Sequence, residues 1–131
     1  MAARRRLAPN GLLVVNLVSS VQGPGSRAWQ SAHRTLSAVF PHVSAYEGSE
    51  PYDDLGNVIF FAGDAPMPAK LPASAPPEIV EHAKRALAHP LKPEGGELLT
   101  DDFAPMESLL ADSSVRWRRV LQSKISEIML Y

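Results

Sequence analysis

The stretch of the chain richest in groups that could bind a ligand is residues 46–54, here called the acidic segment. It carries four carboxylates and two tyrosines within nine residues. Carboxylates bind ammonium groups through charge-assisted hydrogen bonds, and the faces of tyrosine rings attract the same cations. The acidic segment therefore suits an amine ligand. A solvated surface loop is the alternative, and it is the simpler interpretation on composition alone.

A second carboxylate pair, Asp101 and Asp102, precedes Pro105. Acidic side chains near a helix start are stabilised by the free amides and the dipole of the helix, and proline suits a first helical turn. The pair therefore has two interpretations, a cap for a helix that begins near Pro105 or part of a binding site. Capping is the simpler one.

Other chemistry finds little support in the sequence. The four histidines show no metal-ligand spacing. The chain has no cysteine, which excludes disulfides, a thiol nucleophile and thiolate ligands. Ser19 and Ser20 lack the glycine-flanked turn of a nucleophile elbow. Residues 22–25 could hold an anion on free amides, but a tight turn is the simpler interpretation. We therefore predict no catalytic residue and no metal ligand.

The elements that must position these groups begin with residues 12–18, an apolar run interrupted by Asn16 that follows the turn signal at 9–11. Its shortness and its Val and Leu content predict a strand buried on both faces, as in mostly parallel sheets covered by helices. Residues 26–40 repeat apolar side chains at three- and four-residue steps and predict a helix. Residues 42–47 and 57–63 predict two further strands. They are joined by nine residues, a somewhat long connection that still favours an antiparallel hairpin.

The second half of the chain is predicted to form a linker followed by helices. Residues 64–77 hold five of the twelve prolines and predict a stiff surface linker. A helix is predicted over 77–88, then a short one to Ala111, then a last one capped by Ser113 or Ser114. The last helix carries an apolar stripe of Trp117, Leu121, Ile125 and Ile128. Its basic side is interpreted as solvated, and a partner for the stripe is the alternative.

Composition indicates one ordinary globular domain, 45% hydrophobic and 21% charged. We divide it into a sheet part (1–63), the linker (64–77) and a helical segment of the same domain (78–131). The net charge of −1 gives no case for nucleic acid or an anionic membrane. Arginines at 4–6 before an apolar run resemble a secretory signal, but the turn at 9–11 breaks the pattern. We therefore expect a cytoplasmic protein without a membrane span.

Four strings in order resemble the C-terminal half of spermidine-synthase-like proteins, the aminopropyltransferase branch of the S-adenosylmethionine-dependent methyltransferase fold. They are RLAPNGLLVVN at 6–16, FPHV at 40–43, GNVIFFA at 56–62 and LTDDFAPM at 99–106. The resemblance covers residues 5–110. It implies an α/β fold that contains the last three strands of a seven-stranded Rossmann-like sheet.

In that sheet, residues 12–17 would be the fifth strand, 42–47 the sixth and 57–63 the antiparallel seventh. The fifth strand would lie between the seventh and a fourth strand that the chain lacks. Complete members transfer an aminopropyl group from decarboxylated S-adenosylmethionine to a polyamine, and some relatives are methyltransferases. The family's glycine-rich cofactor loop, acidic ribose ligand and catalytic aspartate belong to the earlier half, and none of those motifs occurs here. We therefore expect this chain alone to bind no cofactor and to be inactive.

The resemblance also implies the site. Tyr52 is similar to a tyrosine that contacts the polyamine in spermidine synthases, and Asp53 and Asp54 follow it. Asn16 stands where those enzymes usually have a glutamine. The implied partners are a polyamine or other amine in the completed fold, and either self-association or an N-terminal-half chain. The alternatives are a non-catalytic module that completes a partner chain and a fragment of a methyltransferase for another nucleophile.

Overall fold

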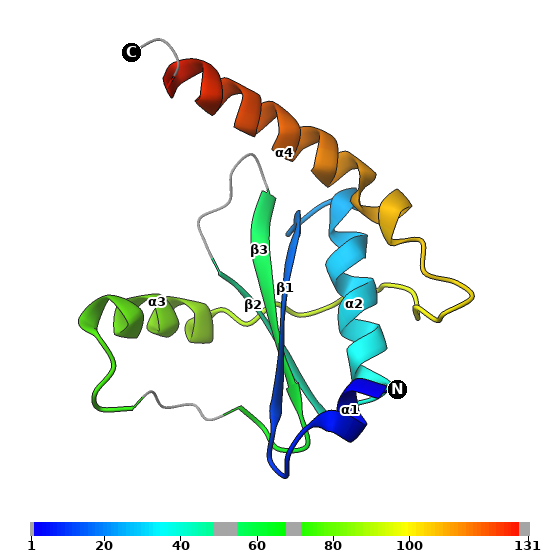
Figure 1. Cartoon of the computed structure of the whole chain (residues 1–131), viewed down its shortest axis with the longest axis vertical. Helices are drawn as coiled ribbons and strands as arrows, with labels where there is room; N and C mark the ends of the chain where they lie inside the picture. Colours follow the sequence, from blue (N-terminus) through cyan, green and yellow to red (C-terminus); the bar gives the residue numbers. More distant parts are fainter. Residues whose placement is uncertain (1, 49–54, 68–71, 129–131) are drawn as a thin grey trace.

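The computed structural model describes residues 2–48, 55–67 and 72–128 of the 131-residue chain. At its centre is a three-stranded antiparallel sheet of β1 (Leu12–Ser20), β2 (His42–Glu47) and β3 (Leu55–Gly63), in the order β1–β3–β2 (Figure 1). Because β3 is antiparallel to both neighbours, β1 and β2 run parallel to each other. The mixed α/β class and the antiparallel pairing of β2 with β3 are confirmed.

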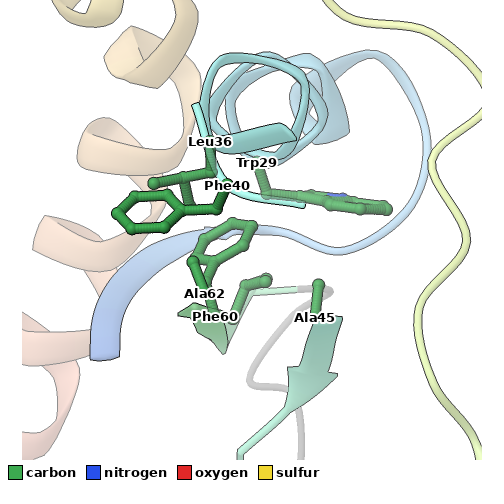
Figure 2. Close-up of a cluster of buried hydrophobic side chains, with 7 residues drawn as sticks. Trp29, Leu36, Phe40, Ala45, Phe60 and Ala62 are labelled. Carbon is green, nitrogen blue, oxygen red and sulfur yellow. The ribbon is translucent and has the colours of Figure 1, made fainter. Parts of the chain in front are cut away.

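Helix α2 (Arg27–Ser37) connects β1 to β2 and packs on one face of the sheet, where it contributes Trp29 and Leu36 to the core. Figure 2 shows Trp29, Leu36 and Phe40 packed against Phe60 and its sheet neighbours. The helix predicted over residues 26–40 spans Arg27–Ser37, and a 3-10 turn over Pro24–Ser26 comes directly before it. The apolar stripe predicted on this helix is confirmed, because its side chains are the ones that the sheet buries.

The prediction that residues 12–18 form a strand buried on both faces is wrong for this chain. Exposure alternates along β1, and Leu12, Val14 and Val18 on the face turned away from α2 are 41%, 54% and 39% exposed. No described element packs over that part of the face. Among the described residues β1 pairs with β3 alone, so its other edge presents backbone donors and acceptors without a strand partner.

Residues 91–99, here called the strap, follow α3 (Pro77–Ala88) and run from the edge of β2 across α2. The Leu91 amide donates to the Ala45 carbonyl at 2.8 Å. Three further strap amides donate 2.9 Å hydrogen bonds to α2 side chains, namely Glu94 to Gln30 Oε1, Glu97 to Ser31 Oγ and Leu99 to Thr35 Oγ1. Side chains of α2 therefore order a segment that has no helix or strand of its own.

One helix, α4 (Met106–Ile128), replaces the two predicted after residue 105. Ser113 and Ser114 are not caps. Ser113 lies inside the helix, is 2% exposed, and its Oγ accepts the Ser20 amide at 3.3 Å. No glycine or proline interrupts residues 106–128, and serine is tolerated inside a helix, so the helix continues through the predicted break.

The remaining described segments are the first helix and residues 64–67 and 72–76. Helix α1 (Ala2–Arg6) is held by Arg4, which contacts Asp64 at 2.7 Å and donates to the Val39 carbonyl at 2.9 Å. The described residues between 64 and 76 form no helix or strand. Across the described ranges, no helix is both long and apolar enough to cross a membrane.

Candidate functional site

The acidic segment emerges at the end of the sheet where β1 and β2 finish and β3 begins. The register pairs Ser20 with Leu55 and Glu47 with Val58, so these three strand ends meet. Tyr46, Glu47 and Gly48 are the residues of the segment that the structure describes. The predicted amine ligands Tyr52, Asp53 and Asp54 lie outside the described residues, and their role stays a prediction.

Asn16 lies in the middle of β1, is exposed and sits opposite Ile59 of β3. Tyr46 of β2 pairs with the same Ile59 from the other side. Directly paired residues share a face of the sheet, and side chains two apart along a strand do so too. Asn16, Tyr46 and Asn57 therefore occupy the face turned away from α2. We call these three residues the amide–phenol cluster.

The amide–phenol cluster offers uncharged hydrogen-bond acceptors and an aromatic ring. The Tyr46 ring meets Phe61 edge to face, with centroids 5.9 Å apart and an interplanar angle of 65°. Adjacent strands are about 4.8 Å apart, so the backbones of Asn16 and Tyr46 are separated by roughly 10 Å across β3. Amide oxygens accept hydrogen bonds from ammonium groups, and aromatic faces attract them. These groups can orient an amine, while a carboxylate would have to balance its charge.

Glu47 is the described carboxylate nearest this end of the sheet, but it belongs to the opposite face. It pairs with Val58, whose side chain is in the core beneath α2. A Cβ added to the neighbouring Gly56 would lie 3.2 Å from Glu47 Oε1 and 3.0 Å from Val21 Cγ2. The glycine thus leaves room for the Glu47 side chain, and the sheet separates that carboxylate from Asn16.

Asp101 and Asp102 occupy an exposed turn, away from the amide–phenol cluster. The turn is closed by backbone hydrogen bonds of 2.8 and 3.1 Å between Thr100 and Phe103. Within the described ranges, neither carboxylate is hydrogen-bonded to the first turn of α4, which begins at Met106. In Figure 1 the turn (yellow) lies on the same side of the sheet as α2. The strand register places the cluster on the other face.

Ser19, Ser20 and Ser113 are buried together where α4 meets the end of β1. Ser19 Oγ donates to the Gly25 carbonyl at 3.3 Å, and the hydroxyls of Ser20 and Ser113 are 3.4 Å apart. A Cβ on Gly25 would come within 2.7 Å of Ser20 Oγ, so this junction requires small residues. These hydroxyls fix the position of α4 on the sheet.

His33 on α2 is half-buried, with its Nδ1 3.3 Å from Ser37 Oγ. Burial lowers the pKa of His33 below 6.5 because desolvation disfavours the imidazolium form. In the part of the chain that the structure covers, no three His, Asp or Glu side chains gather as a metal site.

Sequence reasoning missed Asn57 and considered Tyr46 only as part of the acidic segment. The signal that links both to Asn16 is the strand register, which follows once β3 is known to lie between β1 and β2.

Comparison with known proteins finds no matching family model, no matching curated protein and no matching solved structure.

Proposed function

We propose that this chain forms the amine-binding wall of a spermidine-synthase-like aminopropyltransferase, with the cofactor-binding half of the fold supplied by other residues. The observation that carries the proposal is the strand order. β3 lies between β1 and β2 and is antiparallel to both, which is the arrangement expected for the seventh strand between the fifth and the sixth. The free edge of β1 then lies where the fourth strand would pair.

In the proposed reaction the amine nitrogen attacks the propyl carbon of decarboxylated S-adenosylmethionine. A C–N bond forms, the C–S bond breaks, and the sulfur leaves as a neutral thioether. The attacking nitrogen must be neutral to act as a nucleophile. Once the C–N bond has formed, the nitrogen carries a positive charge and passes one proton to a base supplied by the other half. The far ammonium of a diamine stays charged, and it is the group that Asp53 or Asp54 would hold.

The amide–phenol cluster would orient the same substrate. Asn16 and Asn57 can accept hydrogen bonds from an ammonium group without adding charge, and the Tyr46 ring offers its face. These three groups share the sheet face that is turned away from α2. Tyr46 and Asn57 lie near the end from which the acidic segment departs, and Asn16 lies in the middle of β1. The arrangement suits an elongated amine that lies on this face and reaches the end of the sheet.

The experiment is amine titration of a complex between this chain and the N-terminal, glycine-loop half of an aminopropyltransferase. Tyr52→Phe should weaken putrescine binding by roughly 0.5–1.5 kcal/mol, the value of one hydrogen bond. Asp53→Asn or Asp54→Asn should cost roughly 1.5–3 kcal/mol if that carboxylate binds the ammonium directly. Asp101→Asn is the matched control, since its carboxylate lies in the turn beside α2. Equal affinities in all variants would reject the amine site.

A non-catalytic interaction module is the second candidate, and the β1 edge favours it specifically. Nine consecutive residues of β1 carry no charge and no proline, the features that usually protect an edge strand. Such a module would form the same complex with a complementary half. It would bind no amine in the titration, and this outcome separates the two functions.

A further inference from the structure

Among the residues of helix α4 whose exposure the structure describes, the buried one is Ser113, in the first half of the helix. Ser113 is buried against Ser20, and beyond it the helix extends past the ends of β1 and β3 (Figure 1). In this second half Trp117, Leu121 and Ile125 are 40%, 41% and 53% exposed. Their spacing of four residues places them on one stripe of the helix. The structure therefore leaves a large apolar stripe open to solvent.

The same half of α4 is strongly basic. Residues 114–128 contain four basic side chains and one acidic one, although the whole chain has a net charge of −1. Arg116 is 3.6 Å from Asp112, whereas Arg118 and Arg119 are exposed and have no ion pair within the described ranges. With about 100° of rotation per residue, Arg118 and Lys124 border the stripe on its two sides. Positive charge thus flanks the apolar stripe.

We propose that the second half of α4 docks an amphipathic helix of a partner protein whose own apolar stripe is flanked by acidic residues. Charge complementarity selects this occupant, as in other helix-on-helix recognition. A second copy of α4 would bring arginines against arginines. This proposal does not depend on the aminopropyltransferase function.

The direction of the stripe argues against a lipid surface. Trp117 lies about 40° around the helix axis from Ser113, and Leu121 about 80°. Since Ser113 is buried against the sheet, the stripe begins on the side of α4 that faces the protein body. A flat bilayer would collide with the sheet before covering this side, whereas a helix can lie along it.

The test uses an alanine-based helical peptide of about 20 residues, with leucines at three- and four-residue steps flanked by glutamates. A second peptide has lysines in place of the glutamates. Trp29 is 3% exposed and its emission should stay constant, so a change reports on Trp117. We expect a saturable blue shift with the glutamate peptide and weaker binding of the lysine peptide.

Two sets of variants examine the stripe and its charges separately. Leu121→Asp should abolish binding, whereas Val115→Asp, a matched control that is 45% exposed and about 120° around the helix from Leu121, should leave it unchanged. Arg118→Glu, next to the stripe, should lower affinity for the glutamate peptide about three- to tenfold, whereas Arg119→Glu, about 160° around the helix from Leu121, should leave it nearly unchanged.

Four outcomes would overturn the proposal. The first two are no saturable shift of the tryptophan emission with either peptide, and equal binding of both peptides. The third is an emission shift with phosphatidylserine vesicles but with neither peptide, and the fourth is a concentration-dependent emission shift of the chain alone that Leu121→Asp removes. The third would assign the stripe to a membrane, and the fourth to a second copy.

Discussion

Replacing Gly96 with alanine should destabilise the protein strongly, because the strap approaches α2 too closely there to admit a side chain. Gly96 has φ +99°, and a Cβ added to it would lie 2.4 Å from the carbonyl carbon of Gln30 and 2.6 Å from the Ser31 amide nitrogen. Real Cβ atoms essentially never come within 3.0 Å of another group. Both neighbours are backbone atoms of α2, so the strap must move instead.

The size of the effect follows from two losses. An L-residue in the left-handed region costs about 1–2 kcal/mol. Lifting the strap also breaks the 2.9 Å bond from the Glu97 amide to Ser31 Oγ, and Ser31 is 0% exposed. A buried polar group left without its partner costs about 1–3 kcal/mol. The total of about 2–5 kcal/mol is a large part of the 5–15 kcal/mol typical of a whole protein.

Urea unfolding of three alanine variants tests this geometry. At Gly95 the nearest atom to an added Cβ is Gln30 Oε1 at 3.6 Å, an ordinary contact, so Gly95→Ala should change stability by less than about 0.5 kcal/mol. Gly23 has φ +70° and ψ −165°, a backbone region that is essentially restricted to glycine, and nothing lies within 4 Å, so Gly23→Ala should cost only the conformational term, about 1–3 kcal/mol. Equal unfolding midpoints for Gly95→Ala and Gly96→Ala would refute the close contact between the strap and α2.

Three further predictions concern pH, association and the cofactor. Burial lowers the folded-state pKa of His33 below its unfolded value of 6.5, so the contribution of the neutral imidazole to stability should be complete above pH 6.5 and lost as pH falls toward the folded pKa. His33→Gln should remove this part of the pH dependence in thermal melts. An unchanged pH profile in the variant would contradict this role of His33. Val14 of the edge strand β1 is 54% exposed, and Val14→Lys should reduce the self-association of the chain measured by light scattering. Unaltered association would show that another surface is responsible. Calorimetric titration of the isolated chain should detect no binding of S-adenosylmethionine or its decarboxylated form, since the chain has no glycine-rich cofactor loop; micromolar affinity would disprove this.

Local sequence patterns predict β2 and α3, because the apolar periodicity of each segment matches the element that it forms. The bounds of β2 and α3 agree with their apolar periodicity and with proline at the start of α3. β1 continues to Ser20, beyond the predicted strand, because contacts with the Pro24–Ser26 turn and α4 bury Ser19 and Ser20. No local pattern contains those contacts.

Long-range polar contacts explain most of what the sequence could not predict. Ser113 resembles a helix cap in the sequence, and only its contact with Ser20, 93 residues away, shows that it is interior. The strap is ordered by side chains of α2 more than 60 residues away, so its own composition gives no signal. In the candidate site, Asn16 could be proposed from the sequence, but its relation to Tyr46 and Asn57 depends on the register of β3.

The most direct test of the amine site follows the side-chain amide signals of this chain by NMR, in its complex with the N-terminal half of an aminopropyltransferase, during titration with putrescine. The chain has three asparagines, and Asn10, in the turn before β1, serves as an internal control at the other end of that strand. We expect the Asn16 and Asn57 side-chain signals to shift in a saturable way while Asn10 stays fixed, and potassium chloride at equal ionic strength to have no such effect. Three unmoved signals, or shifts that potassium chloride reproduces, would contradict an amine site on this face of the sheet.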